Sequence, residues 1–532
     1  MEPAKIVGLF ALAALAGLGA FARIDHAATA RVWVHARAVA TPGLRGREAG
    51  YVGSQRCRAC HASAWESWHG SFHRTMTQLA APEVVLARAA TMPDGSALER
   101  TESGARWLPG GGGAPRPIVM TTGAHHMQIY WTPAEGGVLQ ALPYAWLVDD
   151  ARFVPNEATL LRPPDDGSVY TWNRVCIRCH AVAGSPGWDE RTNEVDTRVA
   201  ELGIACEACH GPGRRHADAY ALPWSRMIAS AAEAADAMIV QPADLVASAT
   251  NDVCGQCHGI SVAHDEAQWL RHGSSHAPPQ PLAQTSTLVR HPARADQALL
   301  DEVLADDADF LVDRFWPDGM VRVTGRELNG LVESRCHDGG ELSCLSCHSM
   351  HDSDPNDQIA ADRDGDGACT QCHAAERWAS PTHTHHASAS EGARCLNCHM
   401  PRTSWGLLGA VRSHEIDSPS ATTSVDVGRP DACSLCHLDR SLDWTAGWLH
   451  RWYGQPRPDE IAPAGDDALS ASAAVRWLLA GDAGQRAIAA WHMAWPPALV
   501  ASGSSWQSAL LVELFDDPYP AVRLVAQRSI AA

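Results

Sequence analysis

The sequence predicts a mainly α-helical and irregular fold, with a small β-element near residues 105–145 and a C-terminus resembling a helical repeat. Three observations lead to this prediction. Cysteine- and histidine-containing strings recur between residues 176 and 437, with too little chain between them to enclose a conventional hydrophobic core. Residues 106–146 hold short strand-like runs. Residues 465–532 carry Ala, Leu and Trp at helical spacing.

The composition excludes some classes of protein. The chain has 532 residues, 45% of them hydrophobic, and 20 Trp, which excludes a disordered chain. Asp and Glu (61) outnumber Lys and Arg (42), and the net charge of −19 argues against nucleic acid as a partner. The 17 Cys and 27 His then require disulfides, metal sites or covalent cofactors.

The N-terminal element is an apolar run at residues 6–22, behind Lys5. It is short and weakly hydrophobic for a membrane-spanning helix, which needs about 20 apolar residues. Ala-x-Ala strings end at Ala22 and Ala30, where a secretory signal could be cleaved. We therefore expect residues 1–30 to be a signal peptide, or alternatively an uncleaved anchor, and the protein to be periplasmic or on the cell surface. Only this segment, if uncleaved, would contact a membrane.

Sixteen of the seventeen cysteines belong to one repeated string, Cys-x-x-Cys-His, which we number motifs 1 to 8 in chain order. The motifs occupy residues 57–61, 176–180, 206–210, 254–258, 344–348, 369–373, 395–399 and 433–437. Their cysteines are Cys57, Cys60, Cys176, Cys179, Cys206, Cys209, Cys254, Cys257, Cys344, Cys347, Cys369, Cys372, Cys395, Cys398, Cys433 and Cys436. Their histidines are His61, His180, His210, His258, His348, His373, His399 and His437.

This string is typical of covalent c-type haem attachment. The two thiols form thioethers with the haem vinyl groups, and the adjacent histidine binds the iron. A zinc ribbon does not require histidine after every second cysteine, and a disulfide framework requires none. The sequence therefore predicts eight haem c groups, with the porphyrins forming the core of a multihaem cytochrome c. The remaining Cys336 is expected to be a small buried apolar residue, or else a free reactive thiol.

The motifs divide the chain into regions. We expect residues 50–170 to contain motif 1 and the β-element, with strands at 118–122, 127–132 and 138–142. Residues 171–440 form the haem core with seven motifs, and residues 441–532 form an α-helical tail like a HEAT repeat. The acidic turn at 362–367 imitates half of an EF-hand, but its twelfth position is His373. Bound Ca²⁺ therefore stays an open alternative, and a solvated turn is favoured.

The second axial ligand decides whether an iron is closed, as in an electron carrier, or open to substrate. Nineteen histidines lie outside the motifs, which favours closure by a second histidine at most sites. The best-placed distal candidates are His73, His126, His216, His351, His386 and His414. His264, His276 and His291 compete for any remaining iron, and Met76, Met350 and Met400 are alternative thioether ligands.

Several strings resemble the cytochrome c554-type multihaem family. They are Tyr51-Val-Gly-Ser-Gln-x-Cys-x-x-Cys-His, Trp68-x-Gly-Ser-x-His73, Asn173-x-x-Cys-x-x-Cys-His, Cys-Glu207-Ala-Cys-His-Gly-Pro-Gly and Cys395-x-Asn-Cys-His-Met-Pro401. The resemblance covers residues 51–437 and implies electron transfer through closely stacked haems in an exported protein. Phe72 departs from the pattern, because relatives often have a second histidine there.

Two classes of function remain. The favoured one is an electron carrier with no catalytic residue, whose partners are redox proteins, such as a quinol-oxidising membrane complex or another cytochrome. The acidic surface suits a basic partner. The alternative is an oxidoreductase that acts on a small nitrogen or sulfur compound at one open haem. Lys5 is the only lysine, so the Cys-x-x-Cys-Lys motif of octahaem nitrite and tetrathionate reductases is excluded.

Overall fold

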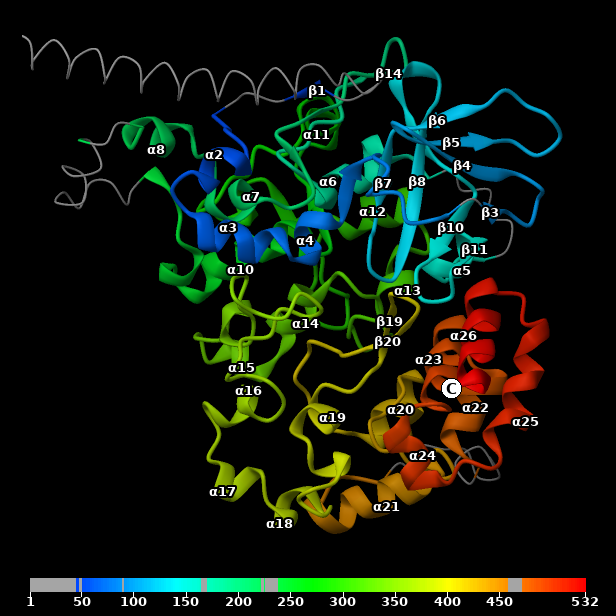
Figure 1. The fold of residues 1–532 in the computed structure, drawn as a ribbon. Helices are drawn as coiled ribbons and strands as arrows, with labels where there is room; N and C mark the ends of the chain where they lie inside the picture. The colour runs from blue at the N-terminus through cyan, green and yellow to red at the C-terminus, as the bar shows by residue number, and fades with distance from the viewer. Residues whose placement is uncertain are drawn as a thin grey trace, which may run out of the picture.

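The computed structural model describes residues 45–46, 50–88, 90–163, 170–221, 224, 238–457 and 471–532. The predicted signal peptide or anchor at residues 1–30 lies outside these ranges. Among the described helices, none is both long and apolar enough to cross a membrane. The N-terminal half, with the sheets, occupies the upper part of Figure 1, and the chain then descends to a helical C-terminal region.

The β-element consists of two antiparallel sheets. The larger has the strand order β11-β10-β8-β7-β2, with β9 pairing β8, and the smaller has the order β3-β4-β5-β6. The larger sheet contains β2 (Thr77–Leu79), β7 (Met120–Thr122), β8 (Met127–Pro133), β9 (Leu139–Ala141), β10 (Tyr144–Leu147) and β11 (Arg152–Pro155). The smaller contains β3 (Ala90–Thr91), β4 (Ala97–Thr101), β5 (Gly104–Leu108) and β6 (Arg116–Ile118).

Alternation of side chains explains the register of the central strands. In β7 and β8, Met120 pairs with Trp131 and Thr122 with Ile129. Both Met120 and Trp131 are almost completely buried. The three predicted strands are present as β7, β8 and β9, but the sheets extend from residue 77 to residue 155, beyond the predicted 105–145. The outer strands have only two to five residues, too few to show a periodic pattern.

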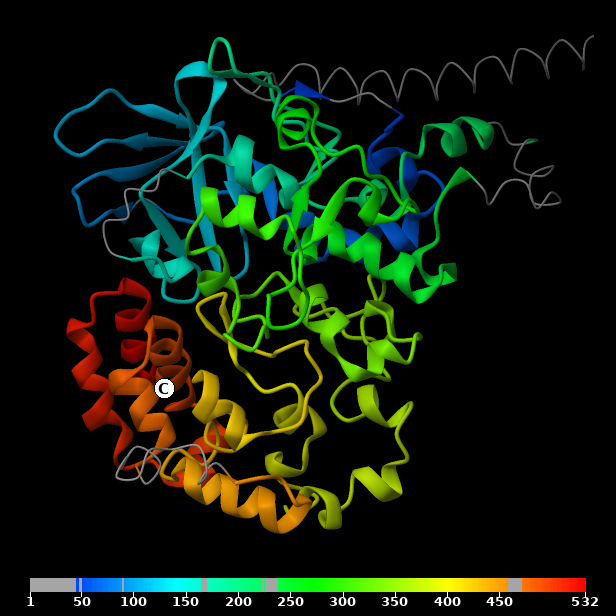
Figure 2. The same cartoon turned by 180° about the vertical axis from the view of Figure 1, so that it is seen from behind.

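The region carrying the motifs has short helices and long irregular connections. Its helices include α2 (Ser54–Arg58), α6 (Ile177–His180), α7 (Cys206–His210), α10 (Ala247–His258), α14 (Glu327–Glu333), α16 (Gly367–Thr370) and α19 (Cys395–His399). In both views these segments run from beside the sheets down one side of the molecule (Figures 1 and 2). Most of the buried apolar clusters lie in the sheets and the C-terminal helices, so this side of the molecule is the region expected to pack around porphyrin.

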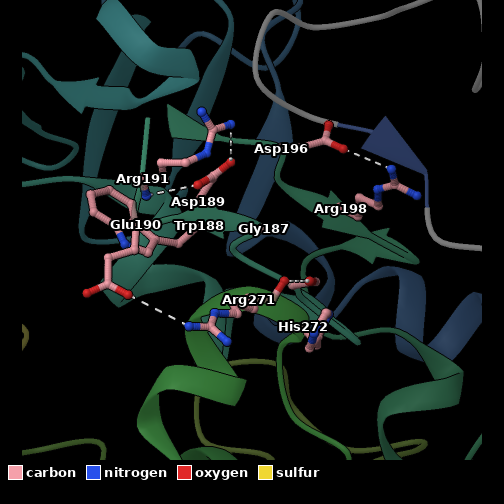
Figure 3. A pocket seen from close by; sticks show the side chains of 10 residues that line it. Gly187, Trp188, Asp189, Glu190, Arg191, Asp196, Arg198, Arg271 and His272 are labelled. Carbon is pink, nitrogen blue, oxygen red and sulfur yellow. Dashed lines mark hydrogen bonds and ion pairs between the residues drawn. The ribbon is translucent and has the colours of Figure 1, made fainter. Parts of the chain in front are cut away.

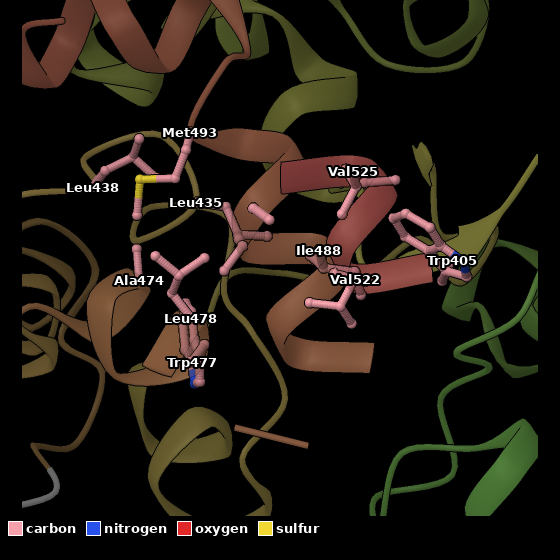
Figure 4. Packing of buried hydrophobic residues seen from close by; sticks show 14 of the residues in the cluster. Trp405, Leu435, Leu438, Ala474, Trp477, Leu478, Ile488, Met493, Val522 and Val525 are labelled. Atoms are coloured by element: carbon pink, nitrogen blue, oxygen red, sulfur yellow. The ribbon is translucent and has the colours of Figure 1, made fainter. Parts of the chain in front are cut away.

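The C-terminal helices form the largest apolar cluster of the described chain. They are α22 (Ala473–Ala480), α23 (Ala483–His492), α24 (Pro496–Ser502), α25 (Gln507–Leu511) and α26 (Pro520–Ala531). Ser472 caps α22, and Asp482 and Gln485 form a capping box on α23. Leu478, Ile488 and Val522 pack together in the cluster (Figure 4). The predicted helical tail is therefore present, while its relation to HEAT repeats stays a prediction.

Two neighbouring leucines on α22 allow a direct test of this packing. Leu478 is fully buried, whereas Leu479 is 47% exposed. We expect Leu478→Ala to lower the free energy of unfolding by about 2–5 kcal/mol, because it removes transfer energy and leaves a cavity. Leu479→Ala, the matched control, should change it by no more than about 0.5 kcal/mol. Urea unfolding followed by circular dichroism measures both, and equal losses would contradict this packing.

Candidate functional site

Each motif is closed by one turn of helix. The backbone N–H of the histidine donates to the carbonyl of the first cysteine, for example at 2.9 Å between His61 and Cys57 and at 2.7 Å between His437 and Cys433. This turn places two cysteines three residues apart on the same side, with the histidine directly after the second. All seventeen cysteines lie in the described residues and none forms a disulfide. The thiols are therefore free for thioether formation.

Six motif histidines face a second histidine ring at nearly constant distance. The ring centroids lie 6.1–6.3 Å apart. The pairs are His61 with His216, His258 with His73, His210 with His351, His348 with His414, His399 with His383, and His437 with His386.

This spacing fits a metal ion between the rings. An imidazole nitrogen lies about 2 Å from a bound transition metal, so two rings on opposite sides of one ion have centroids roughly 6 Å apart. Two imidazoles in direct van der Waals contact, such as a stacked pair, would be much closer. The residues present therefore fit one haem iron, coordinated on both faces, at each of these six motifs.

The structure places five of the six predicted distal histidines opposite a motif histidine. These are His73, His216, His351, His386 and His414. His126 lies directly before β8, with its ring 6.3 Å from the Phe72 ring, and it faces none of the motif histidines in the described chain. His383, which the sequence analysis did not place among the six, faces motif 7 instead. The histidines that competed for remaining sites, His264, His276 and His291, face none of the motif histidines within the described ranges.

Hydrogen bonds at Nδ1 orient many of these rings. His210, His348 and His399 each donate from Nδ1 to a backbone carbonyl, at 2.6, 3.0 and 2.8 Å. On the distal side, His73 Nδ1 lies 2.5 Å from the Gln358 side-chain oxygen. Metal-bound histidines typically donate their second nitrogen in this way, which leaves Nε2 for the metal.

Motif 4 differs because its histidine donates to a carboxylate. His258 Nδ1 lies 2.7 Å from Glu327 Oε2, on the neighbouring helix α14. Burial alone would raise the pKa of Glu327, but the hydrogen bond and charge of His258 lower the pKa to about 2. A carboxylate at this position makes the imidazole a stronger electron donor to any metal that it binds. No sequence pattern points to Glu327, which is 69 residues from His258.

Motif 2 lacks a facing histidine. His180 is partly exposed, and burial of part of its ring lowers its pKa to about 4, so the ring is neutral. Its Nδ1 lies 3.2 Å from the Thr77 hydroxyl of β2. Among the residues that the structure describes, no other histidine ring lies at the spacing found in the six pairs. Motif 2 therefore differs from the six paired motifs, because no second histidine of the described chain faces its histidine.

Motif 3 contacts motif 1. The buried carboxylate of Glu207, inside motif 3, accepts the backbone N–H groups of Val52 and Gly53, at 3.0 and 2.8 Å, just ahead of motif 1. The neighbouring Cys206 thiol also raises the pKa of Cys57. The first cysteines of the two motifs are therefore neighbours.

Motif 4 contacts three other motifs. Its helix, α10, is longer than the other motif helices and meets them on more than one side. The Gln256 side chain donates to the Ala208 carbonyl of motif 3, at 2.9 Å. The Cys179 thiol of motif 2 donates to the Cys257 carbonyl, at 3.7 Å. The Cys344 N–H of motif 5 donates to Asn251 Oδ1, at 3.0 Å. Motif 4 is therefore a junction, meaning the motif at which the contacts of motifs 2, 3 and 5 meet.

Beyond motif 5 the contacts follow chain order. Two hydrogen bonds link the neighbouring motif regions: Gln371 Nε2 to Ser346 O, 3.0 Å, for motifs 6 and 5, and Cys395 N to Asp366 Oδ1, 2.9 Å, for motifs 7 and 6. At motif 8, burial raises the pKa of Cys433, and the nearby Asp431 and the Cys398 thiol of motif 7 raise it further. The contacts therefore order the motifs 1-3-4-5-6-7-8, with motif 2 beside motif 4.

The paired histidines bring motif 5 close to motif 3, and motif 7 close to motif 8. His348 of motif 5 and His351, which faces motif 3, are three residues apart. His383 and His386, also three residues apart, face motifs 7 and 8. Short segments thus hold ligands for two nearby sites.

Two other predicted features, the acidic turn and Cys336, lie in the described chain. In the acidic turn, Asp362 pairs with Arg363 and Asp366 binds the Cys395 N–H, and no group of three or more His, Cys, Asp or Glu in the described chain is arranged around a further metal ion. The prediction that Cys336 is buried was wrong, because α15 (Arg335–Asp338) is a short surface helix and the thiol is exposed.

A surface hollow of about 1020 Å³ lies away from the motif residues (Figure 3). Its walls are charged, and they carry the ion pairs Arg198–Asp196, at 2.8 Å, and Arg271–Glu190, at 3.7 Å. No motif cysteine or histidine lines it. The facing histidines, rather than this hollow, are therefore the candidate site.

Comparisons with known proteins found one matching family and two similar structures. Residues 159–211, which include motifs 2 and 3, match the family described as cytochrome c554 and c-prime. The crystal structure of the outer cell wall cytochrome OcwA is similar with a TM-score of 0.52 at 17% identity, over 90% of this chain and 100% of that one. The undecaheme cytochrome from the S-layer of Carboxydothermus ferrireducens reaches a TM-score of 0.37 at 15% identity, over 92% of this chain and 70% of that one. No curated protein matches. The chain has the fold of a multihaem c-type cytochrome.

Proposed function

We propose that this protein is an exported cytochrome that carries electrons through eight covalently attached haems, six of them ligated by two histidines. The observation that carries the proposal is the set of six imidazole pairs at 6.1–6.3 Å, each containing a motif histidine. The sixteen motif cysteines would hold the haems, and the paired histidines would fill both axial positions. When bound, haem c supplies a one-electron iron couple.

The chain's own residues have three roles in this function. The motif contacts keep neighbouring sites close together, in the order 1-3-4-5-6-7-8. The Nδ1 hydrogen bonds hold the imidazoles in one orientation, so that little reorganisation accompanies a change of charge. Glu327 stabilises positive charge at motif 4 and so favours the oxidised state there.

We also propose that the protein is exported and exchanges electrons with a protein partner. Covalent haem attachment takes place outside the cytoplasm, and the N-terminal apolar segment supplies an export signal. The similar structure is that of an outer cell wall cytochrome, which supports a place in the periplasm or on the cell surface. The net charge of −19 favours a basic redox partner, either a quinol-oxidising membrane complex or another cytochrome.

A second candidate function is favoured by motif 2. His180 has no facing histidine in the described chain, so an iron there would keep one position for a small nitrogen or sulfur compound. Motif 2 lies beside the junction at motif 4, which could deliver electrons to it. This would make the protein an oxidoreductase.

Mass spectrometry and film voltammetry test these functions together. The mature protein should exceed the polypeptide mass by eight haems and exchange electrons reversibly with an electrode in the absence of substrate. A carrier shows no catalytic current when nitrite, hydroxylamine or tetrathionate is added, whereas the oxidoreductase shows one. A mass excess below eight haems would contradict the attachment, and the absence of any reversible signal would contradict electron transfer.

A further inference from the structure

Motif 6 is the second motif without a facing histidine in the described chain, and it differs from motif 2 in its exposure. Cys372 and His373 are both exposed, as are the residues that follow them up to Arg377. His180 of motif 2, by contrast, is only partly exposed. Figure 1 shows α16 and α17 (Ala375–Trp378) at the margin of the molecule, on the side away from the C-terminal helices. A haem attached here would therefore face solvent.

A tryptophan ring, rather than a second histidine, lies near His373. The centroid of the Trp378 ring lies 6.4 Å from that of His373, close to the 6.1–6.3 Å of the six histidine pairs. An indole nitrogen carries its hydrogen and has no free lone pair, so it donates hydrogen bonds but cannot ligate a metal. Trp378 therefore has the spacing of a second ligand without the chemistry of one.

Contacts on its other sides hold Trp378 in place. The Arg377 guanidinium lies 4.4 Å from the ring centroid. The His383 ring, which faces motif 7, meets Trp378 edge to face at 4.9 Å and an interplanar angle of 90°. His383 is already 6.2 Å from His399, in a parallel pair, and so is committed to motif 7. Within the described chain, no histidine ring faces His373 at the spacing of the six pairs.

We infer that the iron at motif 6 keeps one axial position open to solvent and binds a small ligand with a single donor atom, such as a diatomic gas or a simple anion. The inference rests on the proposed haem attachment and adds a second ligand-binding centre, distinct from motif 2. Trp378 lies beside His373 and restricts the ligand to a small size. The site lies between motifs 5 and 7, so a ligand bound there meets the main path of electrons.

Carbon monoxide titration of the reduced, haem-loaded full chain tests this inference. The wild type should bind CO at motif 6 in addition to any CO at motif 2. Replacing both attachment cysteines, Cys369→Ala with Cys372→Ala, should remove one haem from the mass and one equivalent of bound CO. Loss of the haem with no loss of CO would overturn the inference. The mass and the spectra of the remaining paired haems report separately on the proposed function.

A substitution at Trp378 tests the role of the indole. Trp378→His places a ring with a lone pair at the same spacing, so it should convert one high-spin iron to low-spin and remove one equivalent of CO. Trp378→Phe is the matched control, because it keeps an aromatic ring without a ligating atom and should retain both signals. Electron paramagnetic resonance measures the spin states. The inference is wrong if the wild type has no high-spin iron that disappears when Cys369 and Cys372 are replaced by alanine.

Discussion

Replacing Cys254 and Cys257 by alanine is expected to slow electron transfer between motif 5 and motif 1. Motif 4 contacts motifs 2, 3 and 5 through hydrogen bonds of Gln256, Cys257 and Asn251, and no hydrogen bond in the described chain joins motif 3 directly to motif 5. Without a haem at motif 4, electrons that enter near motif 5 should reach motif 1 more slowly, because the remaining link between motifs 5 and 3 is the segment that carries His348 and His351.

The exposed Cys336 thiol provides a place to inject the electron. It lies on α15, shortly before motif 5, and it is the only cysteine outside the motifs. A ruthenium photosensitiser on Cys336 can reduce the protein by a light flash. A His216→Met background, which gives motif 1 a histidine–methionine pair and a higher potential, makes that site the electron sink.

The matched control removes the haem at motif 2 instead of the haem at motif 4. Cys176→Ala with Cys179→Ala deletes motif 2, which contacts motif 4 but lies outside the ordered series from motif 5 to motif 1. Transient absorption should show the electron reaching motif 1 at a similar rate in this control and in the parent, and at a lower rate in the motif 4 variant. Equal rates in all three proteins would contradict the order of motifs.

Removing any one facing histidine is expected to convert one low-spin iron into a high-spin iron that binds CO. The variants are His73→Gly, His216→Gly, His351→Gly, His383→Gly, His386→Gly and His414→Gly, one per pair. The reason is that each pair would supply both axial ligands of one iron, and glycine would leave one face open.

His126→Gly is the control for this series. The ring lies near Phe72 rather than opposite a motif histidine, so the variant should leave every spin state unchanged. Electron paramagnetic resonance at low temperature, with CO titration of the reduced form, measures the result. If His126→Gly produced a new high-spin iron and His383→Gly produced none, the pairing described here would be wrong. The distal ligands would then include His126, as the sequence predicted, and not His383.

The haem attachment residues could be predicted because they are adjacent in sequence. Two cysteines and a histidine within five residues form one helical turn whatever the rest of the chain does. The C-terminal helices could be predicted for a similar reason, since their apolar spacing and caps are local. Central strands β7, β8 and β9 lie in runs with enough strand-like composition to be seen, whereas β3 and β6 do not.

The facing pairs are harder to predict because they join distant segments. His216 lies six residues after motif 3 but faces motif 1, 155 residues earlier in the chain. Sequence proximity therefore points to the wrong motif for it. His383, His385 and His386 are chemically equivalent in sequence, and only the fold directs two of them to motif histidines while His385 stacks on Trp452 at 4.2 Å. Glu327 and Trp378 belong to no motif at all.

Crystallography with anomalous scattering at the iron absorption edge tests most directly whether the facing histidines enclose haem irons. Eight iron peaks are expected, one at each motif. Six should lie midway between the paired histidine rings, and the irons of motifs 2 and 6 should have a protein ligand on one side only. The peaks should follow the order 1-3-4-5-6-7-8, with motif 2 beside motif 4. Fewer than eight peaks, or peaks displaced from the facing histidines, would contradict this assignment.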